Sequence, residues 1–157
     1  MSGISISIAD SELRKLQDDL KRYYRKKENQ IWDAVNDSLL NIKTGAERNL
    51  SSAIISLKNS GSGAGLLGAI FMKPNRSKLE GSVIADKLYA PYLEYGTGKN
   101  VFKSSYNFPQ EARQYAAQFK RGGKRNPNLH ARAFITPVFY EEGENFKNKI
   151  KKILGKV

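Results

Sequence analysis

The side chains that could carry out catalysis are few in this sequence, and their spacing does not suit it. His130 is the single histidine and the chain has no cysteine, so nitrogen and sulfur ligands for a metal are lacking. No Gly-x-Ser-x-Gly segment displays a nucleophilic serine. Four glutamates of the C-terminal third have no spacing that fixes an acid–base pair; they are Glu111, Glu141, Glu142 and Glu144. The sequence therefore predicts a protein that is not an enzyme and binds no cofactor or metal.

A glycine-rich stretch at residues 59–65, Asn-Ser-Gly-Ser-Gly-Ala-Gly, resembles a phosphate-binding loop only in composition. A P-loop continues with Lys-Ser or Lys-Thr after its last glycine, and Leu66 and Leu67 stand there instead. We therefore interpret the stretch as a flexible loop. Because 157 residues suit one domain, we expect the loop to connect parts of a single domain spanning residues 1–157.

The positive charge of the chain is concentrated near its C-terminus. Residues 1–98 carry 14 Lys and Arg against 11 Asp and Glu, a net charge of +3, and residues 99–157 carry 13 against 4, a net charge of +9. This asymmetry favours a polyanion or an acidic protein surface as a partner of the C-terminal third. A solubilising loop together with a solvated helix face explains it equally well.

Residues 99–130 form a basic insert in which aromatic residues stand between the cations. Charge combined with stacking is how many proteins hold single-stranded nucleic acid, so a nucleic-acid-binding module is one candidate function. Loops that order only on assembly have the same composition. The cations predicted to face DNA or an acidic partner are Lys120, Arg121, Lys124 and Arg125.

Hydrophobic periodicity predicts an α+β fold, in which a small antiparallel sheet packs against a long N-terminal helical segment and a C-terminal helix. The hairpin is expected from residues 66–72 and 79–85. The last helix is expected from Thr136, as its N-cap, to about residue 154. Residues 99–130 are by composition the least ordered part, although residues 109–119 suit a short helix.

The long helix is expected from residue 10 to about residue 58, because apolar residues recur every three or four positions. A charged run at residues 25–28 interrupts this stripe and suggests a bend. We expect this stripe to face a core; a coiled-coil partner helix is the alternative, which the small number of sustained heptads disfavours. The members of the stripe are Leu13, Leu16, Leu20 and Tyr23, then Ile31, Val35, Leu39, Ile42, Ala46 and Leu50.

Three isoleucines near the N-terminus alternate with serines; they are Ile4, Ile6 and Ile8. A period of two with β-branched residues on one side indicates a strand with one buried face. Because this strand is short and close to the terminus, we expect it at a sheet edge or paired with another subunit.

Residues 89–98 read Tyr-Ala-Pro-Tyr-Leu-Glu-Tyr-Gly-Thr-Gly. Pro91 suits the first turn of a helix, and Gly96 can take the backbone conformation that ends one. We therefore expect a helical turn at residues 90–95, followed by a Gly-Thr-Gly loop. Its tyrosines either cap a small core or contact a partner.

This stretch and a second segment at residues 131–137, Ala-Arg-Ala-Phe-Ile-Thr-Pro, resemble two segments of a family of tailed-bacteriophage proteins. The family is that of the HK97 gene-product-10-like head–tail joining or tail-completion proteins. Its members typically show Tyr-Ala-Pro-Tyr-Val-Glu-Phe-Gly-Thr and then Ala-Arg-Pro-Phe-Leu-x-Pro. This chain departs at Ala133, where the family usually has proline, and at residues 63–67, where the family usually has Asp-Thr-Gly-x-Leu. Its basic insert is also longer.

The resemblance implies a structural protein of the virion neck, which joins the DNA-filled head to the tail and assembles in the host cytoplasm. It implies a homo-oligomeric ring, expected to be hexameric, with connector or stopper and tail-tube or tail-terminator proteins as partners and DNA near the lumen. Tail completion, tail termination and a connector-side role all stay open. No membrane partner is expected, since no apolar run is long enough to span one.

Within this resemblance, we expect the two segments to pack together and hold the basic insert out toward a partner. The residues predicted to contact other subunits or partners are Ile4, Ile6, Ile8, Tyr89, Tyr92, Glu94, Tyr95, Gly96, Arg132 and Phe134.

Overall fold

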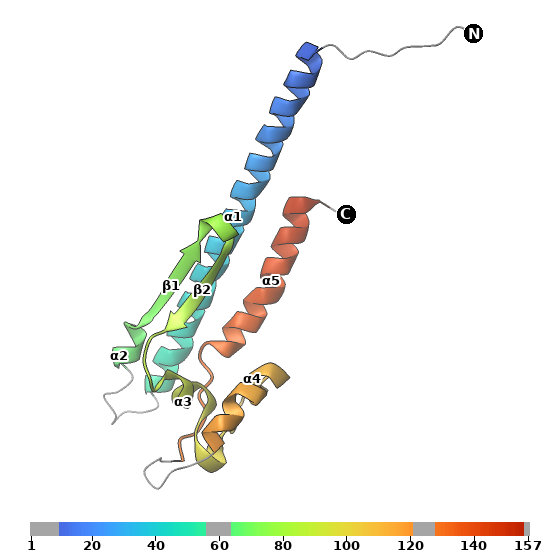
Figure 1. Ribbon diagram of the computed structural model, residues 1–157. Helices are drawn as coiled ribbons and strands as arrows, with labels where there is room; N and C mark the ends of the chain where they lie inside the picture. Colours follow the sequence, from blue (N-terminus) through green and yellow to red (C-terminus); the bar gives the residue numbers. More distant parts are fainter. Residues whose placement is uncertain (1–9, 56–63, 121–127, 156–157) are drawn as a thin grey trace, which may run out of the picture.

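One long helix forms the axis of the molecule, and the other elements pack along one half of it (Figure 1). The computed structural model describes residues 10–55, 64–120 and 128–155. The fold is α+β, as the sequence predicts. Its main elements are α1 (Asp10–Ile55), β1 (Ile70–Asn75), β2 (Glu80–Ala85) and α5 (Thr136–Leu154). Shorter ones are α2 (Ala64–Leu67), η1 (Arg76–Lys78), α3 (Ala90–Tyr95), η2 (Gly98–Asn100), α4 (Gln110–Ala116) and η3 (Ala117–Lys120).

The core lies on the C-terminal half of α1, where the predicted apolar stripe is covered. Ala46 and Leu50 are fully buried, and they cluster with Leu66, Ile70 and Phe134 from other elements. A fully buried leucine or phenylalanine stabilises a fold by about 1.5–3 kcal/mol relative to an exposed one. This cluster therefore fixes the positions of the hairpin and of the segment that leads into α5.

The N-terminal half of the stripe is exposed, so the prediction that it faces a core is wrong within this chain. Leu16 is 58% exposed and Tyr23 is 54% exposed, and Leu13 and Leu20 are also exposed. The reason is length, because α5 ends at residue 154 beside Lys27, whose ammonium donates to the Ile153 carbonyl. We call residues 10–26, which extend beyond this point, the stalk.

The charged run at residues 25–28 does not bend the helix. Figure 1 shows α1 as one continuous helix through these residues. The run marks the place where packing begins. Trp32, one turn further on, lies under the guanidinium of Arg76, which also donates to Asn29 at 2.8 Å. The tip of the hairpin is thereby fixed against α1.

The hairpin is confirmed, although its first strand begins at Ile70 because residues 64–67 form a helical turn. Its register pairs Ile70 with Ala85, Met72 with Val83 and Pro74 with Gly81. These residues share the face that lies on α1. The approach is close, since a Cβ added at Gly81 would lie 2.4 Å from a methyl carbon of Leu39.

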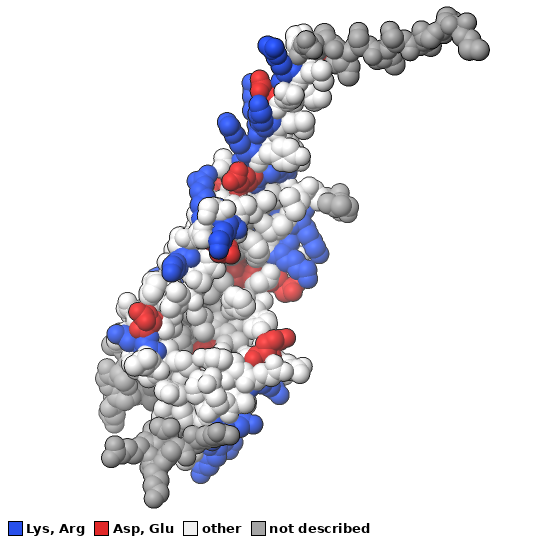
Figure 2. Space-filling view, in the orientation of Figure 1, with Lys and Arg blue, Asp and Glu red and all other residues white. Residues whose placement is uncertain are grey.

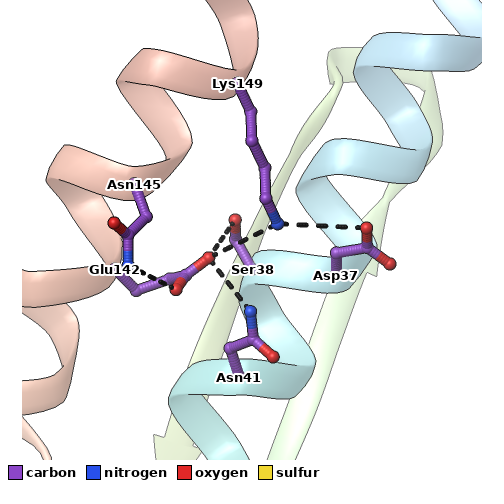
Figure 3. Close-up of polar contacts among 6 residues, drawn as sticks. All are labelled: Asp37, Ser38, Asn41, Glu142, Asn145 and Lys149. Atoms are coloured by element: carbon purple, nitrogen blue, oxygen red, sulfur yellow. Dashed lines mark hydrogen bonds and ion pairs between the residues drawn. The ribbon is translucent and has the colours of Figure 1, made fainter.

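Helices α1 and α5 are held together by close packing and by a buried polar cluster. Glu142 is buried, and its Oε1 accepts hydrogen bonds from Ser38 Oγ at 2.8 Å and from Asn41 Nδ2 at 3.2 Å (Figure 3). The Lys149 ammonium lies 3.8 Å from the same oxygen. The early acidic residues of α5 suit its helix dipole, but the position of Glu142 makes it a cross-link between the two helices.

Replacing two helical glycines by alanine should change the stability of the protein in opposite directions. A Cβ at Gly45 of α1 would lie 2.6 Å from a methyl carbon of Val138, whereas a Cβ at Gly143 of α5 would have no neighbour within 4 Å. Gly45→Ala should lower the free energy of unfolding by about 1–3 kcal/mol, because overpacking outweighs the gain in helix propensity. Gly143→Ala should raise it by up to about 1 kcal/mol. Urea unfolding measures both, and shifts of the same sign would contradict the close crossing of α1 and α5.

Candidate assembly interface

The two segments that carry the sequence resemblance lie side by side, which confirms the predicted contact between them. The backbone N–H of Arg132 donates to the Leu93 carbonyl at 2.8 Å, and that of Thr97 donates to the Leu129 carbonyl at 2.9 Å. The Leu129 N–H in turn donates to Thr97 Oγ1 at 2.9 Å. The residues between the segments therefore leave and re-enter the fold at one place.

Glu94 is the centre of this contact. Its side chain is only 2% exposed, and its carboxylate accepts three backbone hydrogen bonds. Oε2 accepts from the N–H groups of Phe134 at 2.8 Å and Ile135 at 3.1 Å, and Oε1 accepts from that of Thr136 at 2.9 Å. These donors lie at the start of α5, where the first turn leaves N–H groups unpaired and the helix dipole favours an anion.

The prediction that Thr136 caps α5 is therefore wrong. Thr136 is the first residue of α5, its neighbour Ile135 occupies the cap position, and no side-chain hydrogen bond is made from that position. The carboxylate of Glu94 satisfies these donors from 40 residues away. The sequence does not distinguish a local cap from a distant one, because a threonine and a proline can stand at the helix start in either case.

Gly96 ends α3 in a conformation that only glycine adopts easily. Its φ is +77° and its ψ is −179°. A Cβ there would lie 2.7 Å from the Asn100 carbonyl oxygen and 2.8 Å from both the Ala131 nitrogen and the Leu129 carbonyl oxygen. All three are backbone atoms and have little room to move. The sequence-based reading of Gly96 as a glycine-only position is confirmed.

Part of the basic insert is folded over these segments, although its composition suggested little order. Helix α4, with η3 after it, agrees with the helix expected at residues 109–119. Tyr95 lies among Phe108, Tyr115 and Phe119, with ring centroids 5.3, 5.8 and 6.2 Å away. Tyr92 meets Phe119 edge to face at 5.2 Å. Aromatic contacts between residues 92–95 and 108–119 thus order this part of the insert.

The predicted contact residues divide by their burial. Glu94, Gly96 and Phe134 are buried inside the chain and act there as internal supports. Tyr95 and Arg132 are half-buried. Tyr89, at 36% exposed, and Tyr92, at 40%, reach the surface. Ile4, Ile6 and Ile8 lie outside the described residues.

Sequence reasoning missed one exposed side chain at this surface. Leu88 is 97% exposed and stands next to Tyr89. A leucine just after a strand is ordinarily a core residue, so nothing in the pattern marked it.

Among the cations of the insert, Lys120 is exposed, with its ammonium 5.8 Å from the ring centre of Phe102. Arg121, Lys124 and Arg125 lie outside the described residues.

The described residues hold no cluster of side chains that could bind a metal ion. Within residues 10–55, 64–120 and 128–155, no three His, Cys, Asp or Glu side chains come together to hold a metal ion. In the same ranges every helix is too short or too polar to cross a bilayer. Comparison with known proteins adds nothing further, since no family model, curated protein or solved structure matches this chain.

We expect the Glu94 carboxylate to be essential for the junction of the two segments. In Glu94→Gln the amide nitrogen donates instead of accepting, so at least one buried N–H group loses its acceptor. The free energy of unfolding should fall by about 2–4 kcal/mol. Hydrogen exchange at the amides of Phe134, Ile135 and Thr136 should accelerate. Glu111→Gln, on the exposed side of α4, is the control and should change stability by no more than about 0.5 kcal/mol. Unchanged exchange at the three amides would contradict this role.

The half-buried phenol of Tyr95 predicts a loss of stability in alkali. Burial raises the pKa of Tyr95 above its ordinary value of about 10, and a hydrogen bond with the Thr136 side chain only partly opposes this. The folded state thus favours the neutral phenol. This contribution is complete below about pH 10 and is lost as the pH rises through the raised pKa.

Tyr95→Phe should therefore flatten the fall in the free energy of unfolding above about pH 10, by at most about 1.4 kcal/mol per pH unit. Urea unfolding across this range measures it. The parent and the variant share every other alkaline titration, so equal slopes would refute the assignment to Tyr95.

Proposed function

We propose that this protein is a structural component of the neck of a tailed bacteriophage, where copies form a ring that joins the head to the tail. One observation carries the proposal. The two segments that resemble the HK97 gene-product-10-like proteins are hydrogen-bonded to each other through the carboxylate of Glu94. Short motifs can recur by chance, but chance gives no reason for the two segments to form one junction around Glu94, the glutamate of the first segment.

The distribution of apolar surface supports an assembled state. The stalk carries four exposed apolar side chains at helical spacing, and Leu88 stands exposed beside Tyr89. Exposed apolar surface of this kind is typical of protein–protein contacts. A ring subunit needs two such surfaces, because each copy contacts a neighbour on both sides. The stalk and the surface around Leu88 lie toward opposite ends of the molecule (Figure 1).

The test is to express the full chain with and without the proteins encoded beside its gene. Mass photometry and negative-stain imaging should show closed rings, either alone or when a connector or tail-tube protein is added. Leu88→Ser should weaken ring formation without lowering the melting temperature, because the side chain contacts solvent in the single chain. A protein that stays monomeric with every neck component would refute the proposal.

A nucleic-acid-binding module is the second candidate, and one observation favours it. The stalk carries exposed basic side chains, among them Arg22 and Arg25, and the last turn of α5 carries Lys151 and Lys152. Figure 2 shows Lys and Arg gathered along the stalk on this face. Binding to an oligonucleotide that weakens steeply with salt, by a protein that never assembles, would favour this candidate. No binding even at low salt would dispose of it.

A further inference from the structure

The two edges of the β-hairpin differ in what they can bind. The Asp86 N–H donates to the Ala69 carbonyl at 2.9 Å, which places these two residues in a hydrogen-bonded pair. In an antiparallel ladder such pairs alternate with pairs whose N–H and C=O groups point outward. From the register, the outward-pointing groups belong to the pairs that contain Ala85, Val83 and Gly81. These three residues therefore line the outer edge of β2.

The outer edge of β1 is interrupted by a proline, whereas that of β2 has no such interruption. On β1 the corresponding positions include Pro74, which has no N–H to offer and is a common way of protecting an edge strand. On β2, the N–H and C=O groups of Gly81 and Val83 have no backbone partner among the described residues outside the hairpin. An unpaired edge of this kind is a template for one further strand.

An apolar groove runs beside this edge of β2. It has a volume of about 390 Å³ and is lined on one side by Gly81 and Val83 of β2 and on the other by Ile135 and Tyr140. A second hollow of about 320 Å³ adjoins it, because Leu39, Ile42, Gly81 and Phe139 line both. Figure 1 shows β2 between β1 and α5, so the groove separates the hairpin from α5. Phe139 is 56% exposed although it stands at an apolar wall.

We propose that residues 4–8 of a second copy of this chain add to the edge of β2 as a third strand. The segment Ile-Ser-Ile-Ser-Ile has the required pattern, because alternate side chains of a strand point to opposite faces. With Ile6 opposite Val83, the three isoleucines enter the groove on the side that faces α1. Ser5 and Ser7 then face solvent. The segment itself lies outside the described residues.

The donor must be another copy, because a chain cannot reach its own groove. Leu39 is the α1 residue beside Gly81, and 29 residues of helix separate it from Asp10. At about 1.5 Å per residue this is about 43 Å. Residue 6 can lie at most about 14 Å from residue 10, even with the chain fully extended. The distance left over excludes an intramolecular strand.

Donation between copies gives a heterologous contact, in which one surface of a subunit meets a different surface of the next. Repetition of such a contact closes into a ring or extends into a filament. The inference goes beyond the proposed function, since it names the contact between copies and not what the assembly joins.

Cysteine cross-linking tests the register directly, because the natural chain has no cysteine. A variant with cysteine at position 4, 6 or 8 is mixed with a Val83→Cys variant under mild oxidation. Ile6→Cys should form a disulfide between chains, since paired strands bring Cα atoms to about 5.5 Å. Ser5→Cys and Ser7→Cys are the matched controls, because their side chains point to the other face. Cross-linking that fails, or that is equal for isoleucine and serine positions, would overturn the proposal.

A second measurement separates this inference from the proposed function. In the full chain, Ile6→Asp should weaken self-association by at least about tenfold, because a charge replaces a buried apolar side chain. Ser7→Asp should have little effect. If rings formed equally well with Ile6→Asp, the strand contact would be refuted while the ring itself stood. If the variants behaved as expected but the assembly did not involve phage components, the strand contact would be supported and the proposed function would not.

Discussion

The carboxylate of Glu94 is the constraint on which the packed half of the molecule depends. A buried anion is costly unless hydrogen-bond donors surround it, and here three backbone N–H groups do so. Those donors belong to the start of α5, which would otherwise leave them unpaired in the interior. The N–H groups therefore stabilise the buried carboxylate, and the carboxylate in turn supplies the hydrogen-bond acceptor that the N–H groups need. The result fixes where α5 begins, and with it the line along which α5 meets α1.

The parts of the fold that follow from periodicity were predictable. Helices α1 and α5 and the hairpin lie where apolar spacing and turn residues indicated, because these signals are local. The stripe alone did not predict which part of α1 is buried by other elements. Leu16 and Leu50 both belong to the predicted stripe, yet one is 58% exposed and the other fully buried. The difference arises from how far α5 extends, which is a property of the partner helix.

The candidate site likewise contains residues whose role the sequence predicted and residues whose role it did not. Gly96 was identifiable, since a glycine that ends a helical turn has few other reasons to be there. The burial of Glu94 was not, because a glutamate between two tyrosines reads equally well as surface. Only the meeting of two segments 40 residues apart in the chain gives it that role. The aromatic residues of the insert were likewise visible, but Tyr95 at their centre belongs to a different part of the sequence.

The geometry of the stalk also has a mechanical consequence. Residues 10–26 are helical and have no packing partner among the described residues, so they extend about 25 Å beyond the end of α5. A rigid rod of that length acts as a lever arm. A tilt of about 10° in the packed body would carry the free end through about 4 Å, close to the spacing of neighbouring strands. Small rotations of the body thus become displacements large enough to change which residues meet at the far end.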